Sequence, residues 1–291
     1  MDNPFSKIYN DKPDRELIEA SLSGSTGALD ALVKRHQHYI YNVAHKLVLS
    51  PFDAEDITQE VLIKVITNLS QFKGQSDFRT WLYRITFNHF LQMKKYWLED
   101  NITTFDNYAE QLDNVADEEL TAIEKAELKE FIEDAKLGCM NGMLLCLNRE
   151  QRLVYVLGEI FGCDHNLGSS LLGISKDNFR KILSRARRDL YNFMNNKCGL
   201  INTLNPCRCH RKTKGFIKAG WVDPNKLKFN TSYLLKVIEV AKDKATDLDN
   251  ELDTKYADLF RNQPFQEKEH SDKLLKTILN DRKVTDIFNF N

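Results

Sequence analysis

The sequence predicts an all-α protein, and three observations carry this prediction. Apolar residues recur at steps of three and four along residues 29–47, as on one face of a helix. No comparable run alternates apolar and polar side chains with the period of two that marks a half-buried strand. Helix-starting and helix-breaking residues follow at Ser50-Pro51, Gly74 and Gly173. We therefore expect two helical domains, an acidic linker between them, and a mainly helical C-terminal extension.

The first domain is predicted over residues 12–98 as a unit of four helices. One helix begins after Ser50-Pro51, with Asp53 as its predicted N-cap. Its predicted core face consists of Ile57, Val61, Leu62, Val65, Ile66 and Leu69. A later helix, over residues 78–97, interleaves aromatic rings with cations around an apolar stripe of Phe78, Trp81, Leu82 and Ile85. Its other rings either cover a second packing surface or offer stacking platforms to unpaired bases.

The net charge of −1 conceals two blocks of opposite sign. Residues 99–140 form the predicted linker, in which acidic side chains dominate and basic ones are scarce. Its first part, residues 101–114, is expected to be irregular, and a helix is expected to start near Asp117. Residues 176–218 are strongly basic, which is the electrostatic footprint of a nucleic-acid-binding surface, although a solvated helix face also carries such charge.

The second domain is predicted over residues 141–196 and contains a helix-turn-helix pattern. Asn148 caps its first helix, Gly173 makes the turn of the motif, and Ser175 caps the helix that follows. The stripe of that helix expected to be buried is Phe179, Ile182, Leu183, Ala186, Leu190 and Phe193. Its opposite face offers hydrogen bonds to base edges and cations to phosphates, from Lys176, Asn178, Arg180, Lys181, Ser184, Arg185, Arg187 and Arg188.

Composition and the N-terminus exclude several classes of protein. Hydrophobic residues make up 42% of the chain, which is enough for buried cores. The longest uncharged stretch, residues 137–148, is far shorter than the ~20 apolar residues of a membrane-spanning helix. Residues 1–5 show neither the basic nor the apolar region of a secretory signal. We therefore expect a cytoplasmic protein without membrane insertion, whose 6 cysteines are reduced.

Two stretches of the first domain carry a family resemblance: residues 53–65 (DAEDITQEVLIKV) and residues 72–85 (FKGQSDFRTWLYRI), followed by Asn88. They resemble region 2 of bacterial RNA polymerase sigma factors of the extracytoplasmic-function class. Residues 147–190, with the motifs EQR, LGIS and LSRARR, resemble region 4 of the same class. The resemblance covers residues 12–195. It implies a factor that performs no covalent chemistry, is not an enzyme, and directs core RNA polymerase to promoters.

The resemblance implies three binding surfaces. The helix that begins after Ser50-Pro51 would dock on the largest subunit of core RNA polymerase through Asp53, Asp56, Gln59, Glu60 and Lys64. Minus-ten promoter DNA would be captured, read and melted by Phe72, Lys73, Gly74, Gln75, Ser76, Asp77, Arg79, Trp81, Arg84 and Asn88, although Trp81 fits a core position equally well. The helix capped by Ser175 would enter the major groove of the minus-thirty-five element and contact it with its polar face. The acidic linker would thread toward the RNA exit path, and an anti-sigma factor is left open as a further partner.

Four positions depart from the family pattern. Gly168 stands where a branched apolar residue is expected, and Ile182 stands where arginine is frequent. Phe87 and Gln92 replace more usual polar and acidic residues. We therefore do not transfer the docking angle on DNA or the minus-ten sequence preference from the family.

Two other functions fit parts of the sequence. One is a helix-turn-helix regulator with an effector domain, although such a regulator would not need residues 53–65. The other is a metal- or redox-sensing protein centred on residues 198–210. Zinc takes thiolates and imidazoles as tetrahedral ligands, and a turn of reduced cysteines is the alternative. The candidate ligands are Cys198, Cys207, Cys209 and His210. No cofactor is otherwise required.

Residues 197–291 form the predicted extension, which follows the two regions of a minimal sigma factor. Apolar side chains gather in residues 216–229, and helical patterns follow along residues 234–260 and 274–288. Apolar faces of this size must bury against something. We expect the extension to act on the preceding domains: it would inhibit them, assist promoter binding through the basic run of residues 208–218, or only add stability.

Overall fold

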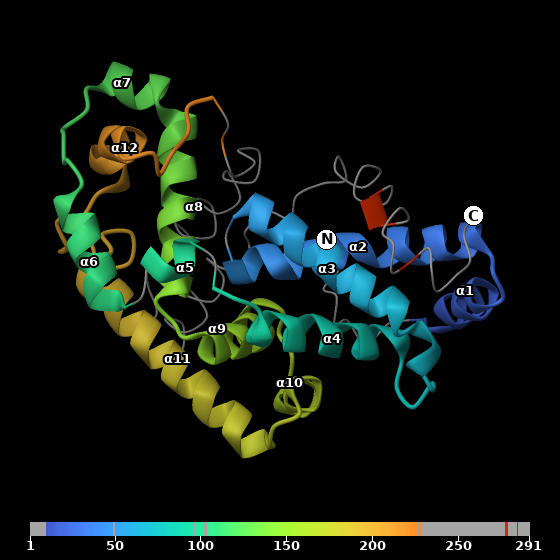
Figure 1. Ribbon diagram of the computed structural model, residues 1–291. Coiled ribbons are helices and arrows are strands. Elements are labelled where there is room, and N and C mark those ends of the chain that lie inside the picture. The colour runs from blue at the N-terminus through green and yellow to red at the C-terminus, as the bar shows by residue number, and fades with distance from the viewer. Residues whose placement is uncertain are drawn as a thin grey trace. The chain divides into compact units, whose positions relative to one another are not determined.

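The computed structural model describes residues 10–48, 50–95, 97–101, 104–225, 227, 277–278 and 284. Every regular element among these residues is a helix, which confirms the predicted all-α class (Figure 1). None of the described helices is both long and apolar enough to cross a membrane. The chain divides into two compact units: residues 1–96, 163–178 and 265–291 form the first, and residues 97–162 and 179–264 form the second.

The first unit is built on a bundle around α3. Its described helices are α1 (Lys12–Leu22), α2 (Thr26–Val48), α3 (Pro51–Thr67), the short 3-10 helix η1 (Leu69–Gln71), α4 (Phe78–Gln92) and α10 (His165–Leu172). Helix α2 packs on both α1 and α3, and α4 packs on α3 and α10. The predicted core face is confirmed: its six apolar side chains, five on α3 and Leu69 on η1, are all at most 3% exposed.

Two predicted helix ends in this unit are wrong. Ser50, not Asp53, is the N-cap of α3: the Ser50 hydroxyl accepts a hydrogen bond from the Asp53 backbone N–H, and Pro51 occupies the first turn, where its missing N–H costs nothing. Helix α4 ends at Gln92 rather than near residue 97, because Met93 takes an extended backbone conformation.

Lys46 of α2 is buried in this unit, at 3% exposure. Burial lowers the pKa of its ammonium group from 10.5 to about 7. At pH values between these two pKa values, Lys46 carries a proton in the unfolded chain but not in the folded protein. Folding stability contributed by this group therefore rises with pH, by at most about 1.4 kcal/mol per pH unit.

We expect Lys46→Met to remove this dependence. The wild-type free energy of unfolding should rise between pH 7 and 9.5, and that of the variant should stay flatter over the same range. Urea denaturation at each pH measures the difference. Lys12→Met, at an exposed position of α1, is the matched control and should keep the wild-type slope. Parallel pH profiles for wild type and Lys46→Met would contradict the prediction.

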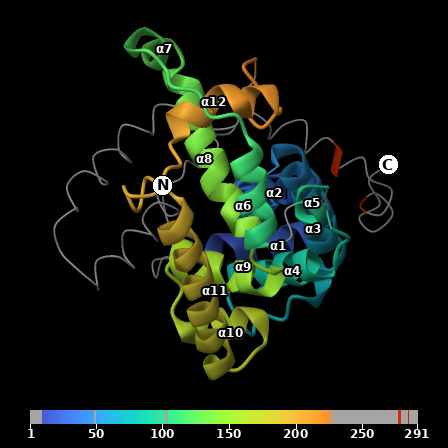
Figure 2. The ribbon, with the colours of Figure 1, turned by 90° about the vertical axis from the view of Figure 1, so that its left-hand side faces the viewer.

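The second unit contains most of the predicted linker and most of the helix capped by Ser175. Its described helices are α5 (Trp97–Asn101), α6 (Phe105–Asn114), α7 (Ala122–Glu127), α8 (Lys129–Leu145), α9 (Arg149–Tyr155), the π-helix η2 (Val156–Ile160), α11 (Lys176–Lys197, from Phe179 onward) and α12 (Cys209–Lys218). Helix α8 contacts α6, α7 and α12, and Figure 2 shows α6 and α12 beside it.

The expectation that residues 101–114 are irregular is wrong, because most of them form α6. The Thr104 hydroxyl caps this helix by accepting from the Asn107 N–H. Tyr108 and Leu112, four residues apart, share one buried face of α6. The Tyr108 hydroxyl donates to the Cys139 carbonyl oxygen of α8 at 2.9 Å. The next helix starts at Ala122, after a capping box between Thr121 and Glu124, rather than near residue 117.

Glu99, the first residue of the predicted acidic linker, is buried in the second unit. Its carboxylate is 2% exposed and pairs with two arginines, Arg149 at 2.6 Å and Arg152 at 3.0 Å. Arg152 also donates to the carbonyl oxygens of Leu144 and Leu147. This ionic cluster joins α5 to α9 and to the end of α8. The helical patterns predicted along residues 234–260 and 274–288 lie almost wholly outside the described residues.

Candidate nucleic-acid interface

The predicted polymerase-binding residues form a row along α3. Asp56, Glu60 and Lys64 are exposed and lie four residues apart, which places their side chains in one line on the helix surface. Asp53 and Gln59 flank this row and are half-exposed. Phe52, four residues before Asp56, extends the row and is 65% exposed. An exposed aromatic ring at the end of a polar row is typical of a protein-binding surface.

His89 of α4 connects two members of the row. Its Nε2 lies 3.3 Å from a Glu60 carboxylate oxygen, and its Nδ1 lies 2.6 Å from Lys64 Nζ. Burial and the nearby Lys64 ammonium lower the pKa of His89, and Glu60 opposes them. Sequence reasoning missed both His89 and Phe52. The spacing of four residues from Asp56 could have indicated Phe52, whereas only the packing of α4 on α3 reveals His89.

The loop of residues 72–77 is supported by the N-terminal helix. The Arg15 guanidinium lies over the Phe72 ring, 5.8 Å from its centroid, and donates to the Gly74 carbonyl oxygen at 3.5 Å. The Asp11 carboxylate accepts from the Phe78 N–H at 2.7 Å. Gly74 has a φ of +70°, a conformation that favours glycine. No local sequence pattern could have predicted that Arg15 contacts this loop, because the two lie far apart along the chain.

Phe72 does not stand free in this loop. Its ring packs on Phe78 and Trp81, with centroid distances of 5.4 and 5.6 Å. Trp81 remains partly exposed, so both predicted roles of this ring, core packing and base contact, stay open. Lys73 and Gln75 are the exposed side chains at the tip.

Most rings of α4 are core rather than stacking platforms. Tyr83, Phe87 and Phe90 are at most 1% exposed, so the alternative of a second packing surface is confirmed for them. Ile85, predicted to belong to the buried stripe, is only half-buried. The wider apolar face arises because α4 packs on α3 on one side and on α10 on another.

The polar residues predicted to contact minus-ten DNA differ in their surroundings. Asn88 is exposed. Arg84 donates to the Ser170 carbonyl oxygen at 3.2 Å and to the Ser170 hydroxyl at 2.9 Å. Arg79 is half-buried, and burial lowers its pKa. Trp81, Arg84 and Asn88 follow each other at steps of three and four, so they share one side of α4.

The Gly173 turn and the Ser175 cap predicted for the helix-turn-helix are confirmed. Asp164 caps α10 by accepting from the Asn166 and Leu167 N–H groups, and Gly173 adopts the left-handed conformation with a φ of +66°. The Ser175 hydroxyl accepts from the Asn178 N–H at 3.2 Å. The left-handed residue ends α10, and the serine cap begins α11, so the turn between them is short.

Helix α11 separates an apolar face from a basic one, as predicted. Five of the six stripe residues are buried, including Ile182, while Leu183 is half-buried against Gly158. The exposed polar residues are Lys176, Asn178, Arg180, Lys181, Ser184, Arg185 and Arg188. Arg187 differs from them, because its Nε donates to the buried Glu159 carboxylate at 2.8 Å. This ion pair ties α11 to η2 and gives Arg187 a structural role.

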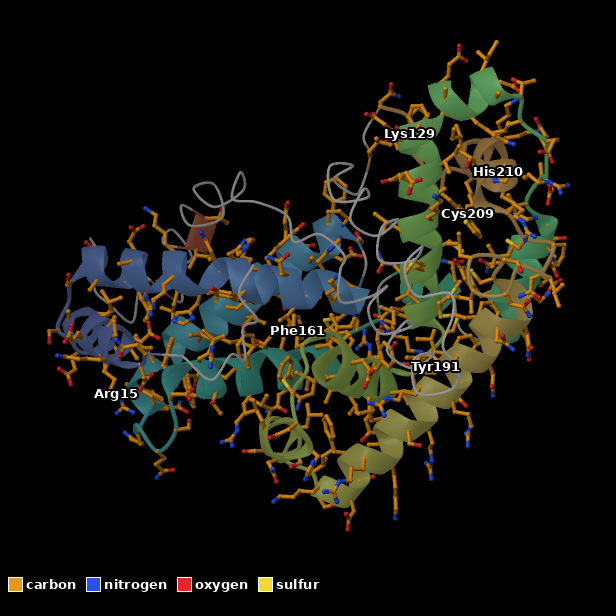
Figure 3. The ribbon with its side chains drawn as sticks, turned by 180° about the vertical axis from the view of Figure 1, so that it is seen from behind. Arg15, Lys129, Phe161, Tyr191, Cys209 and His210 are labelled. Carbon is orange, nitrogen blue, oxygen red and sulfur yellow. The ribbon has the colours of Figure 1, made fainter. Side chains whose placement is uncertain are left out.

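Cysteines gather in the second unit: Cys139 of α8, Cys198 after α11, and Cys207 and Cys209 at the start of α12. They lie close enough for Cys198 and Cys207 to raise the pKa of Cys209, but burial is the main cause that raises this pKa to about 12. Cys207, Cys209 and His210 line a cavity of about 340 Å³ beside Lys129 (Figure 3).

Among the described residues, no three His, Cys, Asp or Glu side chains are arranged to hold a metal ion. A cysteine binds zinc as a thiolate, and burial disfavours the thiolate form of Cys209. Zinc binding by Cys198, Cys207, Cys209 and His210 therefore stays a prediction. Sequence reasoning missed Cys139, which only the packing of α8 on α12 brings to this cluster.

Comparison with known proteins finds relatives among bacterial sigma factors. The model of sigma-70 region 2 matches residues 32–96, which hold most of α2 and all of α3 and α4. The chain carries a sigma-70 region 2 domain. It is 28% identical over 166 residues to the ECF RNA polymerase sigma factor SigE of Mycolicibacterium smegmatis, which covers 57% of this chain and 61% of that protein. The predicted resemblance to sigma factors of the extracytoplasmic-function (ECF) class is confirmed.

Further relatives match over shorter stretches. The RNA polymerase sigma-H factor of Pseudomonas aeruginosa is 37% identical over 81 residues, covering 28% of this chain and 42% of that protein. The ECF RNA polymerase sigma-E factor of Escherichia coli is 40% identical over 75 residues, covering 26% of this chain and 39% of that protein. The chain thus spans less than two thirds of the length of each of these sigma factors.

Proposed function

We propose that this chain is a sigma factor that binds core RNA polymerase, directs it to promoters and starts transcription there. The observation that carries the proposal is the sigma-70 region 2 match to residues 32–96, which includes the exposed row of α3. The capped helix-turn-helix and the basic face of α11 support a second contact with promoter DNA. The sigma factor works in the cytoplasm, where core polymerase is.

Each surface has one task in this proposal. The α3 row binds the polymerase, the loop of residues 72–77 and the polar side of α4 capture unpaired minus-ten bases, and α11 enters the major groove upstream. Trapping unstacked bases in pockets drives melting, since extruding a base costs only a few kcal/mol. No covalent step and no cofactor are needed, and an anti-sigma factor is a further partner to test.

Transcription in vitro with purified core polymerase over a genomic library tests the proposal. We expect specific start sites that appear only when the chain is added, and their upstream sequences define the promoter. A chain that binds duplex DNA tightly by itself, without binding core polymerase, would instead support the helix-turn-helix regulator. Absence of both core binding and chain-dependent start sites would overturn the proposal.

The basic face of α11 should contribute to upstream promoter binding. We expect the triple variant Arg180→Ala, Lys181→Ala and Arg185→Ala to weaken binding. The slope of the logarithm of the binding constant against the logarithm of the salt concentration should become shallower by about one for each removed cation that pairs with a phosphate in the wild type. Promoter footprints by the holoenzyme at several salt concentrations measure both effects. Lys12→Ala with Lys34→Ala, on α1 and α2, controls for charge removed elsewhere. An unchanged footprint in the triple variant would show that this face is exposed to solvent and does not contact the promoter.

A further inference from the structure

Helix α12 of the extension pairs with an acidic segment of the predicted linker, residues 115–124, within the second unit. Two cations of α12 carry the pairing. Arg211 lies 2.6 Å from a carboxylate oxygen of Asp117 and 3.5 Å from one of Glu119. Lys214 lies 3.6 Å from Glu118 and 2.7 Å from Glu124. The hydrogen bond from Lys214 is the largest cause that lowers the pKa of Glu124 to about 2.

These ion pairs are partly exposed, and exposed pairs alone hold a segment weakly. Two hydrogen bonds to backbone groups fix the register of the pairing. Lys212 is 6% exposed, and its Nζ donates to the Val115 carbonyl oxygen at 2.8 Å. The Glu118 N–H donates to the Arg211 carbonyl oxygen at 2.9 Å. Both bonds use backbone groups, so they hold the chain path of the segment as well as its side chains.

Gly215 brings α12 into direct contact with the segment. A Cβ atom at this position would lie 2.6 Å from a Val115 methyl carbon and 2.7 Å from the Ala116 carbonyl oxygen, closer than atoms can approach. Only glycine therefore fits there. On its other side α12 packs on α8, which anchors it in the second unit (Figure 2).

We propose that α12 is an internal competitor for the acidic segment: it binds the carboxylates that a basic, nucleic-acid-binding surface of core polymerase would otherwise pair with. This inference rests on the proposed function. While α12 holds the segment, the linker keeps the folded path seen here and cannot extend along a basic channel. Core polymerase must displace α12 before the linker can enter, so the extension restrains the sigma factor of which it is part.

Two kinds of variant open the contact in the full-length chain. Gly215→Ala places a methyl group where the segment lies, and Gly27→Ala is its matched control, because a Cβ at that helical glycine meets no atom within 4 Å. Arg211→Asp reverses one charge of the pair, and adding Asp117→Arg restores an ion pair of opposite polarity. Lys218→Glu, at an exposed position on the last turn of α12, controls for charge on the same helix.

Hydrogen exchange of residues 115–124 reports the contact itself. We expect about tenfold faster exchange in Gly215→Ala and in Arg211→Asp, which corresponds to a segment held less tightly by about 1.4 kcal/mol. Exchange should return toward the wild-type rate when Asp117→Arg is added. Wild-type rates in both opening variants would overturn the inference.

Transcription at limiting core polymerase reports the competition. We expect the opening variants to give several-fold more transcript than wild type, the charge-swapped double variant to return toward wild type, and both controls to match it. Faster exchange with unchanged or lower transcription would overturn the competitor role, because a released segment would then give no advantage. If no variant, wild type included, binds core polymerase, the proposed function fails and the competitor role fails with it. The exchange rates would still show whether α12 holds the segment.

Discussion

Replacing Glu99 by glutamine is expected to lower the free energy of unfolding of the second unit by roughly 3–5 kcal/mol, because the change leaves buried guanidinium charge without its counter-charge. The Arg152 side chain is 3% exposed and that of Arg149 is 13% exposed, so water cannot replace the carboxylate. Glutamine keeps the shape and removes only the charge. The loss should appear as a lower urea midpoint at pH 7, measured by far-ultraviolet circular dichroism.

Glu130→Gln makes the same chemical change at an exposed position of α8 and should alter stability by less than about 0.5 kcal/mol. A second comparison tests the pairing directly. Adding Arg152→Met to Glu99→Gln should cost less than the sum of the two single changes, because contacting residues couple. Additive losses, or a Glu99→Gln midpoint equal to that of Glu130→Gln, would show that this ionic cluster does not hold α5 against α9.

The double variant Asp56→Arg with Gln59→Arg is expected to weaken binding to core polymerase by about a hundredfold, since like charges juxtaposed across an interface cost several kcal/mol. Both side chains lie on the exposed side of α3, and neither contributes to the buried core face of that helix. The fold should therefore survive the change. Titration of labelled core polymerase with this protein measures the affinity.

The matched control is Glu16→Arg with Glu19→Arg, which has the same three-residue spacing on the exposed side of α1. It should bind core polymerase as wild type does. Thermal unfolding of both double variants separates an interface effect from a folding defect. Normal affinity in a correctly folded Asp56→Arg, Gln59→Arg variant would remove the α3 row from the polymerase interface.

Local patterns predicted much of the fold. The core face of α3 follows from apolar residues at helical spacing, and the turn of the helix-turn-helix follows from Gly173 and Ser175, whose caps involve residues at most five positions away. The resemblance to sigma factors followed from residues 53–65 and 72–85 for the same reason, since these motifs are contiguous. Sequence patterns gave a wrong prediction where the local signal was weak. The polar composition of residues 101–114 indicated an irregular segment, whereas the Thr104 cap and two buried side chains stabilise α6.

The helical class, the position of the helix-turn-helix and the resemblance to sigma factors follow from the sequence, because each depends on neighbours within a few turns of chain. The folded structure was needed to show that Glu99 is buried, that Arg187 pairs with Glu159, that Arg15 supports the loop at Gly74, and that α12 holds the acidic segment. In each case the partner lies tens of residues away. A charge in a sequence does not reveal its partner, because folding, rather than chain order, sets the distance between them.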